Sequence, residues 1–396
     1  MKKRLLVILS AALIFAMLLS LSACVTEEPP VATEEPTEAP TVAPLEKPTT
    51  KATKKKTELN LSLYTTYELA QDYDHFKLWG RTTVLESGLA CDFTASGIEF
   101  EGNIGGDVIL KLSCDRDTYF TVYIDGVRQE ERLKANPNVS QLTVASFDED
   151  SRDFHNIRIL KQTEPQWSLS VLKSISVKGE LDEPPANREL YIEVIGDSIT
   201  CGYGNLNIDG KSSSGALYQD GTQSYGFMTA EALGADCSIV GCSGIGIDVG
   251  WTEWSESDFY PQTSYYRDKT GNPYDFSSAR VPDLVIINLG TNDNSFRGKG
   301  TEENNFKQGV RDLINYVRDS YGEDIPIVWA HNMMGGCCFE WTSVVLEEMG
   351  GESAGIYSIK LVANNAGGGG HPTLEAQKKA AEDLTAFINE KEILTK

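Results

Sequence analysis

The sequence predicts an all-β sandwich of jelly-roll type, followed by an α/β domain that is built on a parallel sheet. Residues 58–185 contain short apolar or alternating runs separated by Gly, Asp and Asn, which is typical of a β-sandwich. After Pro184-Pro185 the pattern changes, and residues 186–396 alternate apolar strands with helical segments. The chain of 396 residues is long enough for two such domains.

Residues 1–23 have the composition of a secretory signal, because M-K-K-R is followed by an apolar run and small residues. The segment Leu21-Ser22-Ala23-Cys24 resembles a bacterial lipobox, which implies cleavage before Cys24 and a lipid on its thiol. An ordinary signal peptide or an uncleaved anchor is the alternative. We therefore expect an extracellular lipoprotein that is anchored to the cell membrane only through Cys24.

Amino-acid composition also indicates the state of residues 24–57, and the net charge of the chain limits which partners it can bind. Residues 24–57 are rich in Pro, Thr, Glu and then Lys, with no aromatic residue, so they cannot bury enough apolar surface to fold. We predict a disordered tether there. The net charge of −23 repels nucleic acid and anionic surfaces, so we expect no nucleic-acid partner.

Five runs of residues are predicted to be strands of the β domain. The dipeptide Asp125-Gly126 is typical of the turn of a β-hairpin. These runs cover residues 97–103, 107–114, 119–126, 155–161 and 171–179. The predicted strands of the α/β domain cover residues 190–198, 237–241, 283–290 and 325–330, and its helices cover residues 224–235, 302–321 and 373–391. Ser224 is the expected N-cap of the first helix.

Chemically useful residues follow the strands of the α/β domain, at the sheet edge where ligands of such folds bind. Ser198 lies in a tight turn after the first strand, which exposes its hydroxyl and places its N–H where an oxyanion would form. Gly244 and Asn292 lie in the turns after the second and third strands. The spacing around Ser198 is neither that of an α/β-hydrolase nucleophile elbow nor that of a phosphate loop.

Four short blocks together carry a family resemblance. G-D-S-I-T at 196–200, the glycine turn around Gly244, G-T-N-D at 290–293 and H-P at 371–372 resemble, in this order, the blocks of the SGNH (GDSL-type) hydrolase superfamily. The segment 194–205 is most similar to the carbohydrate esterase family 2 acetyl (xylan) esterases, which carry a jelly-roll domain in front of the hydrolase domain. The resemblance implies a three-layer α/β/α hydrolase domain.

The resemblance also implies roles for individual residues. Ser198 would be the nucleophile, and His371 would take its proton and return it to the leaving alcohol. The backbone N–H groups of Ser198 and Gly244 and the side-chain amide of Asn292 would form the oxyanion hole. Gly241 and Gly246 are rivals for the place of Gly244 on the same turn.

The chain departs from the family pattern just before His371. Many superfamily members have an Asp two or three residues earlier, where this chain has Gly369 and Gly368. One explanation is a Ser–His dyad, in which a backbone carbonyl of the glycine run accepts the ring N–H. The other is a distant carboxylate, with Glu375 and Asp293 as the candidates. We favour the dyad, because we expect Glu375 to be solvated and Asp293 to brace its own loop.

Two further expectations concern the surroundings of the site. Trp251 and Trp254 follow the Gly244 turn and would form a sugar-stacking wall, unless they serve core packing or loop anchoring. The eight cysteines show no zinc spacing, so we expect neither a metal nor another cofactor. Removing Cys24 leaves seven, so at least one thiol is free or pairs elsewhere.

The resemblance implies a secreted O-acetyl esterase that deacetylates plant cell-wall polysaccharides such as xylan or glucomannan through a serine acyl-enzyme. Its partner would be an acetylated polysaccharide or oligosaccharide. The first alternative is a lipid or thioester hydrolase of the same superfamily. The second is a catalytically weak carbohydrate-binding surface protein, which the missing Asp motivates.

Overall fold

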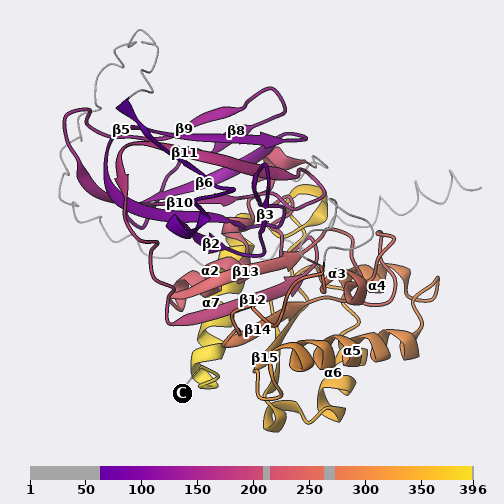
Figure 1. Ribbon diagram of the computed structural model, residues 1–396. Coiled ribbons are helices and arrows are strands. Elements are labelled where there is room, and N and C mark those ends of the chain that lie inside the picture. The colour runs from indigo at the N-terminus through magenta and orange to yellow at the C-terminus, as the bar shows by residue number, and fades with distance from the viewer. Residues whose placement is uncertain (1–62, 208–214, 263–272, 395–396) are drawn as a thin grey trace, which may run out of the picture. The chain divides into compact units, whose positions relative to one another are not determined.

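The computed structural model describes residues 63–207, 215–262 and 273–394. The predicted signal (1–23) and tether (24–57) lie outside the described residues. Residues Leu59–Lys396 form one compact unit, which contains an antiparallel β domain and a parallel-sheet domain (Figure 1). Both kinds of domain were predicted.

The antiparallel domain is organised around one long strand, β5 (Gly97–Cys114). Its first half pairs with β10 and its second half with β9, while β11 follows it from Gly102 to Cys114. The other strands extend this sheet on either side. Their bounds are β1 (Thr65–Glu68), β2 (Lys77–Trp79), β3 (Thr83–Leu85), β4 (Gly88–Ala90), β6 (Thr118–Ile124), β7 (Val127–Arg128), β8 (Leu133–Ala135), β9 (Gln141–Ser146), β10 (Asp153–Lys161) and β11 (Ser170–Leu181).

Two sequence predictions in this domain have different outcomes. The hairpin at Asp125-Gly126 is confirmed, since both residues have positive φ and Ile124 pairs directly with Val127. The prediction of separate strands at 97–103 and 107–114 is wrong, because β5 runs through Gly105-Gly106 without ending. Gly106 adopts a φ of +61°, so the chain bends there and continues in the same strand.

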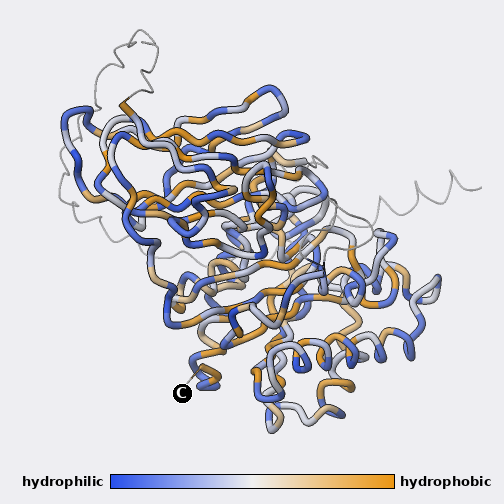
Figure 2. Tube along the Cα trace, viewed as in Figure 1, coloured by the Kyte–Doolittle hydropathy of each residue, from blue (hydrophilic) through white to orange (hydrophobic). Residues whose placement is uncertain are grey.

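The second sheet is parallel, with the strand order β13-β12-β14-β15-β16. Its strands are β12 (Leu190–Gly196), β13 (Ala235–Gly241), β14 (Leu284–Asn288), β15 (Ile327–His331) and β16 (Ile356–Lys360). Every residue of β12 from Ile192 on and all of β13, β14 and β15 are buried, as expected for strands covered on both faces. Figure 2, which colours the chain by hydropathy, shows hydrophobic (orange) stretches along the strands of this sheet. The edge strand β16 was not predicted, because its alternate residues are partly exposed and its apolar run is short.

Helices cover the two faces of this sheet and make three layers (Figure 1). Val285 and Ile287 pack in the core that contains α3, α5 and α6, whereas Leu284 and Ile286 pack in the core of α2 and α7. The bounds are α2 (Tyr225–Ala232), α3 (Glu256–Phe259), α4 (Thr291–Phe296), α5 (Glu303–Tyr321), α6 (Phe339–Glu348) and α7 (Leu374–Glu390). Ser224 holds the N-cap position of α2, but its side chain makes no capping hydrogen bond.

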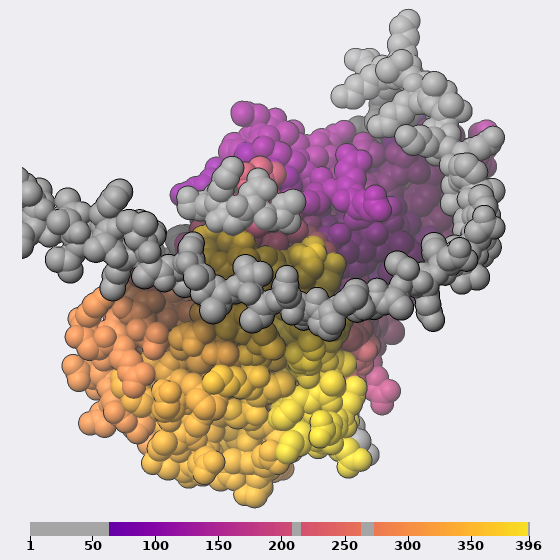
Figure 3. Space-filling model, turned by 180° about the vertical axis from the view of Figure 1, so that it is seen from behind, coloured from indigo at the N-terminus to yellow at the C-terminus, as the bar shows by residue number. Residues whose placement is uncertain are grey.

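The β domain shares a hydrophobic core with the α2–α7 layer. Trp79 and Tyr123 belong to the same buried cluster as Val194 and Tyr225. In Figure 3, β-domain atoms (purple) lie against atoms of the C-terminal region (yellow). A docked core of this kind makes the two domains one structural unit.

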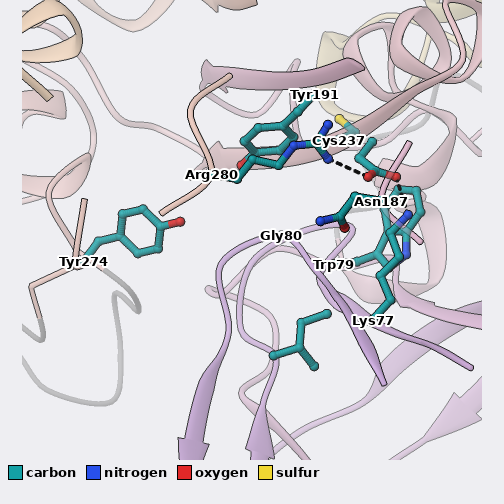
Figure 4. A pocket seen from close by; sticks show the side chains of 10 residues that line it. Lys77, Trp79, Gly80, Asn187, Tyr191, Cys237, Tyr274 and Arg280 are labelled. Carbon is teal, nitrogen blue, oxygen red and sulfur yellow. Dashed lines mark hydrogen bonds and ion pairs between the residues drawn. The ribbon is translucent and has the colours of Figure 1, made fainter. Parts of the chain in front are cut away.

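Charged side chains also join the two domains. Arg81 is buried, and its guanidinium lies 3.2 Å from the Glu193 carboxylate of β12 and over the Tyr274 ring. At the start of β13, Asp236 accepts hydrogen bonds of 2.7 Å from Lys77 and from Arg280, beside a pocket of about 180 Å³ (Figure 4). This pocket lies at the amino end of β13, whereas Ser198 follows the carboxyl end of the neighbouring strand β12.

Candidate active site

Ser198 lies in the turn that follows β12 at the carboxyl edge of the parallel sheet. Gly196 is required there, because a Cβ would lie 2.1 Å from the Thr200 hydroxyl oxygen. Asp197 braces the turn by accepting a 2.9 Å hydrogen bond from the Ile199 N–H. Ser198 keeps only 6% of its surface exposed and is followed by further turns, not by a helix. The turn thus presents one hydroxyl at a nearly enclosed position.

His371 faces this hydroxyl. Its Nε2 lies 2.8 Å from Ser198 Oγ, and its Nδ1 lies 3.2 Å from the carbonyl oxygen of Gly369. If Nδ1–H donates to that carbonyl, Nε2 is left to accept the serine proton. Burial lowers the pKa of His371 below its ordinary value, and the carbonyls of Gly369 and Gly368 partly offset that effect. The imidazole is therefore neutral near pH 7 and can act as a base.

The glycine run before His371 is needed for close backbone packing. The Gly368 N–H donates to the Gly204 carbonyl at 2.9 Å, and a Cβ on Gly204 would lie 2.3 Å from the Gly368 oxygen. Gly369 and Gly370 have φ values of +63° and +77°, which glycine adopts at little cost. The run therefore bends tightly beside the serine turn and presents a carbonyl to the imidazole.

The two carboxylates that were candidates to orient His371 lie elsewhere. Asp293 accepts backbone N–H hydrogen bonds of 2.8 to 3.0 Å from the three residues Ile247, Asp248 and Val249. Glu375 is exposed in the first turn of α7. Within the described residues, no hydrogen bond joins His371 to a carboxylate, and the geometry matches the backbone explanation.

The predicted oxyanion donors surround the same turn. Gly244 follows β13 with a φ of +85°, and its carbonyl accepts a 2.7 Å hydrogen bond from the Trp251 N–H. Asn292 Nδ2 lies 2.8 Å from the Ile245 carbonyl oxygen and 3.2 Å from the Asp197 carboxylate. Asn292 thus ties the Gly244 turn to the Ser198 turn. Both of its amide hydrogens are engaged, so the longer bond to Asp197 must yield before Asn292 donates to an oxyanion.

Asp197 is therefore coupled to Asn292, the predicted oxyanion donor. It is fully buried, and burial raises its pKa to about 7. The hydrogen bond from the Ile199 N–H opposes this shift. The raised pKa means that Asp197 changes charge near neutral pH beside Asn292.

The two predicted substrate-binding tryptophans have different environments. Trp251 is 72% exposed, and its ring centroid lies 4.9 Å from that of Phe296. Trp254 is partly buried and packs against the core of the α3–α5–α6 layer. Trp251 is therefore free to stack on a ligand, whereas Trp254 follows the core-packing alternative.

The sequence missed the contribution of the β domain to this site. The segment 162–168, between β10 and β11, reaches the site. The Trp167 ring lies 6.1 Å from that of Tyr203, which in turn lies 4.4 Å from the His371 ring. Glu164 and Gln166 contact Ser243, the residue before Gly244. These residues carry no motif, and the only sequence signal was an aromatic residue in a loop.

The described part of the chain gives two further observations. It places no group of three or more His, Cys, Asp or Glu side chains where they could hold a metal ion. None of the helices in this part is both long enough and apolar enough to cross a membrane.

Comparisons with protein families match both domains. Residues 192–339 match the model of the GDSL-like lipases/acylhydrolases, and residues 78–185 match the model of the carbohydrate esterase 2 N-terminal domain. The cellulase/esterase CelE of Acetivibrio thermocellus is 26% identical over 322 residues, which are 77% of this chain and 38% of CelE. An acetylxylan esterase / glucomannan deacetylase of Cellvibrio japonicus is 26% identical over 63% of this chain and 71% of its own length.

Solved structures give the same result. A family two carbohydrate esterase from Clostridium thermocellum, in complex with cellohexaose, superposes with a TM-score of 0.70 at 26% identity, over 80% of this chain and 99% of that one. The acetyl xylan esterase Est2A of Butyrivibrio proteoclasticus has the same fold, with a TM-score of 0.73 at 21% identity over 84% of this chain and all of its own. The chain thus carries a GDSL-type hydrolase domain behind a carbohydrate esterase 2 N-terminal domain, and its relatives are carbohydrate esterase family 2 enzymes.

Proposed function

We propose that this chain is a carbohydrate O-acetyl esterase that works through an acyl-enzyme on Ser198, with His371 as its base. The observation that carries the proposal is the pair of contacts on His371, which lies 2.8 Å from Ser198 Oγ on one side and 3.2 Å from the Gly369 carbonyl oxygen on the other. A nucleophile next to a base, which is itself oriented by a third group, is the arrangement that serine acyl transfer requires.

In the first half of the reaction, neutral His371 accepts the Ser198 proton while Oγ attacks the acetyl carbonyl. The oxyanion that forms would accept hydrogen bonds from the N–H groups of Ser198 and Gly244 and from Asn292. His371 then gives its proton to the departing sugar hydroxyl. In the second half a water molecule attacks the acetyl group while His371 takes one proton of this water. The intermediate then collapses: His371 returns the proton to Ser198 Oγ as the bond from Oγ to the acetyl carbon breaks, and acetate leaves.

A Ser–His dyad accounts for the missing Asp. The Gly369 carbonyl fixes the tautomer of His371, but it stabilises the imidazolium less than a carboxylate would. We therefore expect a slower chemical step than in an otherwise equal Ser–His–Asp site. The lower basicity of the partly buried imidazole acts in the same direction.

For the substrate, we propose acetylated plant cell-wall polysaccharides such as xylan or glucomannan. Two observations support this class of substrate. The Cellvibrio japonicus relative is an acetylxylan esterase / glucomannan deacetylase, and the family two carbohydrate esterase from Clostridium thermocellum was solved in complex with cellohexaose. The exposed Trp251 ring beside the Gly244 turn offers a flat apolar surface of the kind that sugar rings stack on. A lipid or thioester hydrolase is the runner-up.

We also propose export of the chain and attachment to the membrane through a lipid on Cys24. The lipobox-like Leu21-Ser22-Ala23-Cys24 supports this part of the proposal. Labelling of producing bacterial cells with radioactive palmitate should mark the wild-type chain and leave Cys24→Ala unlabelled. Equal labelling of both chains would contradict the anchor.

Acetate release from acetylated xylan and acetylated glucomannan tests the activity, with lysophospholipid as the competing substrate and Ser198→Ala as the control. We expect release from at least one polysaccharide by wild type and none above background by Ser198→Ala. Preferential cleavage of lysophospholipid would favour the lipid hydrolase. Binding of the polysaccharide without release of acetate would favour the carbohydrate-binding surface protein.

A further inference from the structure

Two side chains of the β domain hold the backbone just before Gly244. Glu164 accepts two hydrogen bonds of 2.5 Å from Ser243, one from its N–H and one from its hydroxyl. Gln166 Nε2 donates to the Ser243 carbonyl oxygen and lies 3.2 Å from Cys242 Sγ. The β domain thus binds both polar backbone groups of Ser243.

The bond from Gln166 fixes the direction of the Gly244 N–H. The Ser243 carbonyl and the Gly244 N–H belong to one peptide unit, which is planar and trans, so they point in opposite directions. Gln166 holds the carbonyl on the β-domain side. The Gly244 N–H must therefore point away from the β domain.

The same bond also makes the Gly244 N–H a better donor. A hydrogen bond to the carbonyl of a peptide polarises the unit, and such cooperativity strengthens a neighbouring bond by roughly 10 to 30%. A preset donor helps catalysis because it need not reorient when charge develops on the substrate. The hydrogen bond from Gln166 therefore both orients the Gly244 N–H and strengthens it as a donor.

The segment that carries Glu164 and Gln166 is itself firmly held. Glu164 is fully buried and accepts a third hydrogen bond, of 3.2 Å, from Gln219 Nε2. The buried Lys161 ammonium donates to the backbone carbonyls of Thr163 and Glu164. A carboxylate buried in this way needs its partners, because burying a charge without a partner strongly destabilises the folded state. Movement of the Ser243 peptide away from Glu164 would leave that carboxylate short of two donors.

We propose that Gln166, supported by Glu164, is a positioning residue that aims the Gly244 N–H at the oxyanion, so that the β domain is part of the catalytic apparatus. The inference rests on the proposed function and deepens it. It also gives the β domain a role that does not depend on binding carbohydrate.

The test compares Gln166→Met with wild type, using 4-nitrophenyl acetate and the full chain. Methionine keeps the length of the side chain but removes the donor. We expect kcat to fall about tenfold to a hundredfold with KM nearly unchanged, since a donor that is lost outright typically costs roughly a hundredfold or more. The pH at which kcat/KM is half-maximal should not move, because His371 is untouched.

Two further variants separate positioning from folding. Gln129 lies elsewhere on the β domain and donates to the Val127 carbonyl, so Gln129→Met makes the same change without touching the site. It should retain wild-type kcat. Glu164→Gln keeps an acceptor for the Ser243 N–H, so its loss of kcat should be smaller than that of Gln166→Met. Unfolding midpoints within error of wild type exclude a folding defect as the cause.

Three results would overturn this inference while leaving the proposed function intact. Gln166→Met could be as active as Gln129→Met, it could change KM without changing kcat, or it could shift the pH at which kcat/KM is half-maximal. An effect on KM would mean that Gln166 binds substrate, and a shifted limb would mean that it acts through His371. Failure of the proposed function gives a different result, because wild type would then be no faster than Ser198→Ala. That outcome would also remove the oxyanion on which the inference depends.

Discussion

The two sides of the candidate site are held in different ways. On one side, His371 is oriented by the carbonyl of Gly369, two residues before it in the same chain segment. On the other side, the peptide that joins Ser243 to Gly244 is held by Gln166, which lies 77 residues before Ser243 and belongs to the other domain. The proposed base thus depends on local backbone geometry, whereas the proposed oxyanion donor depends on the docking of two domains. Each dependence can be broken separately.

The largest effect is expected at the contact between the domains. Arg81→Met removes the charged partner of the buried Glu193 carboxylate, which keeps hydrogen bonds from the Tyr260 and Tyr321 hydroxyls. Loss of one member of a buried ion pair costs about 3 to 5 kcal/mol of unfolding free energy. The matched control is Arg311→Met, which breaks a more exposed pair with Glu348 and should cost less than about 1 kcal/mol. Urea unfolding of both variants measures the difference. Equal unfolding free energies would mean that Arg81 does not hold the domains together.

The next effect concerns the oxyanion side. Asn292→Ala removes a side-chain donor and the link from the Gly244 turn to Asp197. We expect kcat for 4-nitrophenyl acetate to fall by roughly 10²- to 10³-fold with little change in KM. A variant with wild-type kcat would exclude Asn292 from the oxyanion hole.

A smaller effect is expected on the base side. Gly369→Ala forces alanine into a φ of +63°, and its Cβ would lie 3.5 Å from His371 Nδ1 and 3.2 Å from the Tyr203 ring. We expect kcat to fall about tenfold, because a left-handed conformation costs a non-glycine residue roughly 1 to 2 kcal/mol and the carbonyl must shift.

Gly298→Ala is the matched control for this change. Gly298 has a similar φ of +71°, but a Cβ there would have no neighbour within 4 Å. It therefore carries the same backbone strain without contact to His371. Equal losses of kcat in the two variants would show that strain, and not the position of His371, causes the effect.

The smallest expected effect is a shift of the acidic limb of the pH–activity profile to lower pH. His371 must be neutral to accept the serine proton, and burial lowers its pKa below the ordinary value of about 6.5. Activity should therefore be present at pH 7 and be lost as the pH falls through a value below 6.5. The pKa of Asp197 is about 7, so its titration would add a second limb to the pH–activity profile. Asp197→Asn should remove this second limb. A single limb above pH 6.5 that persists in Asp197→Asn would contradict a partly buried imidazole that is held by a carbonyl.

The same comparison separates what the sequence predicted from what it missed. Ser198 and Asn292 could be expected to lie together because each lies within four residues of the end of a buried parallel strand, and such strand ends share one edge of the sheet. The carbonyl contact of His371 could be expected because glycine adopts the left-handed bend beside it at little cost. Both inferences use properties of a short segment.

Other features depend on contacts that no short segment encodes. Glu164 and Gln166 lie in a loop without periodicity, and their role appears only when the two domains dock. Trp251 and Trp254 have similar sequence surroundings, yet the fold exposes one and packs the other against a core. Contacts between residues far apart in the sequence determine the role of Glu164 and Gln166 and the different exposure of the two tryptophans.

The central claim is that Ser198 is the nucleophile and that His371 activates it. A 4-nitrophenyl alkylphosphonate tests this claim most directly, because it transfers its phosphonyl group to an activated serine and the product hydrolyses slowly. We predict release of one 4-nitrophenolate per full-length chain and a phosphonyl mass on the peptide that contains Ser198, with much slower labelling of His371→Ala. Absence of labelling, a label on another residue, or labelling at the same rate in His371→Ala would contradict the account.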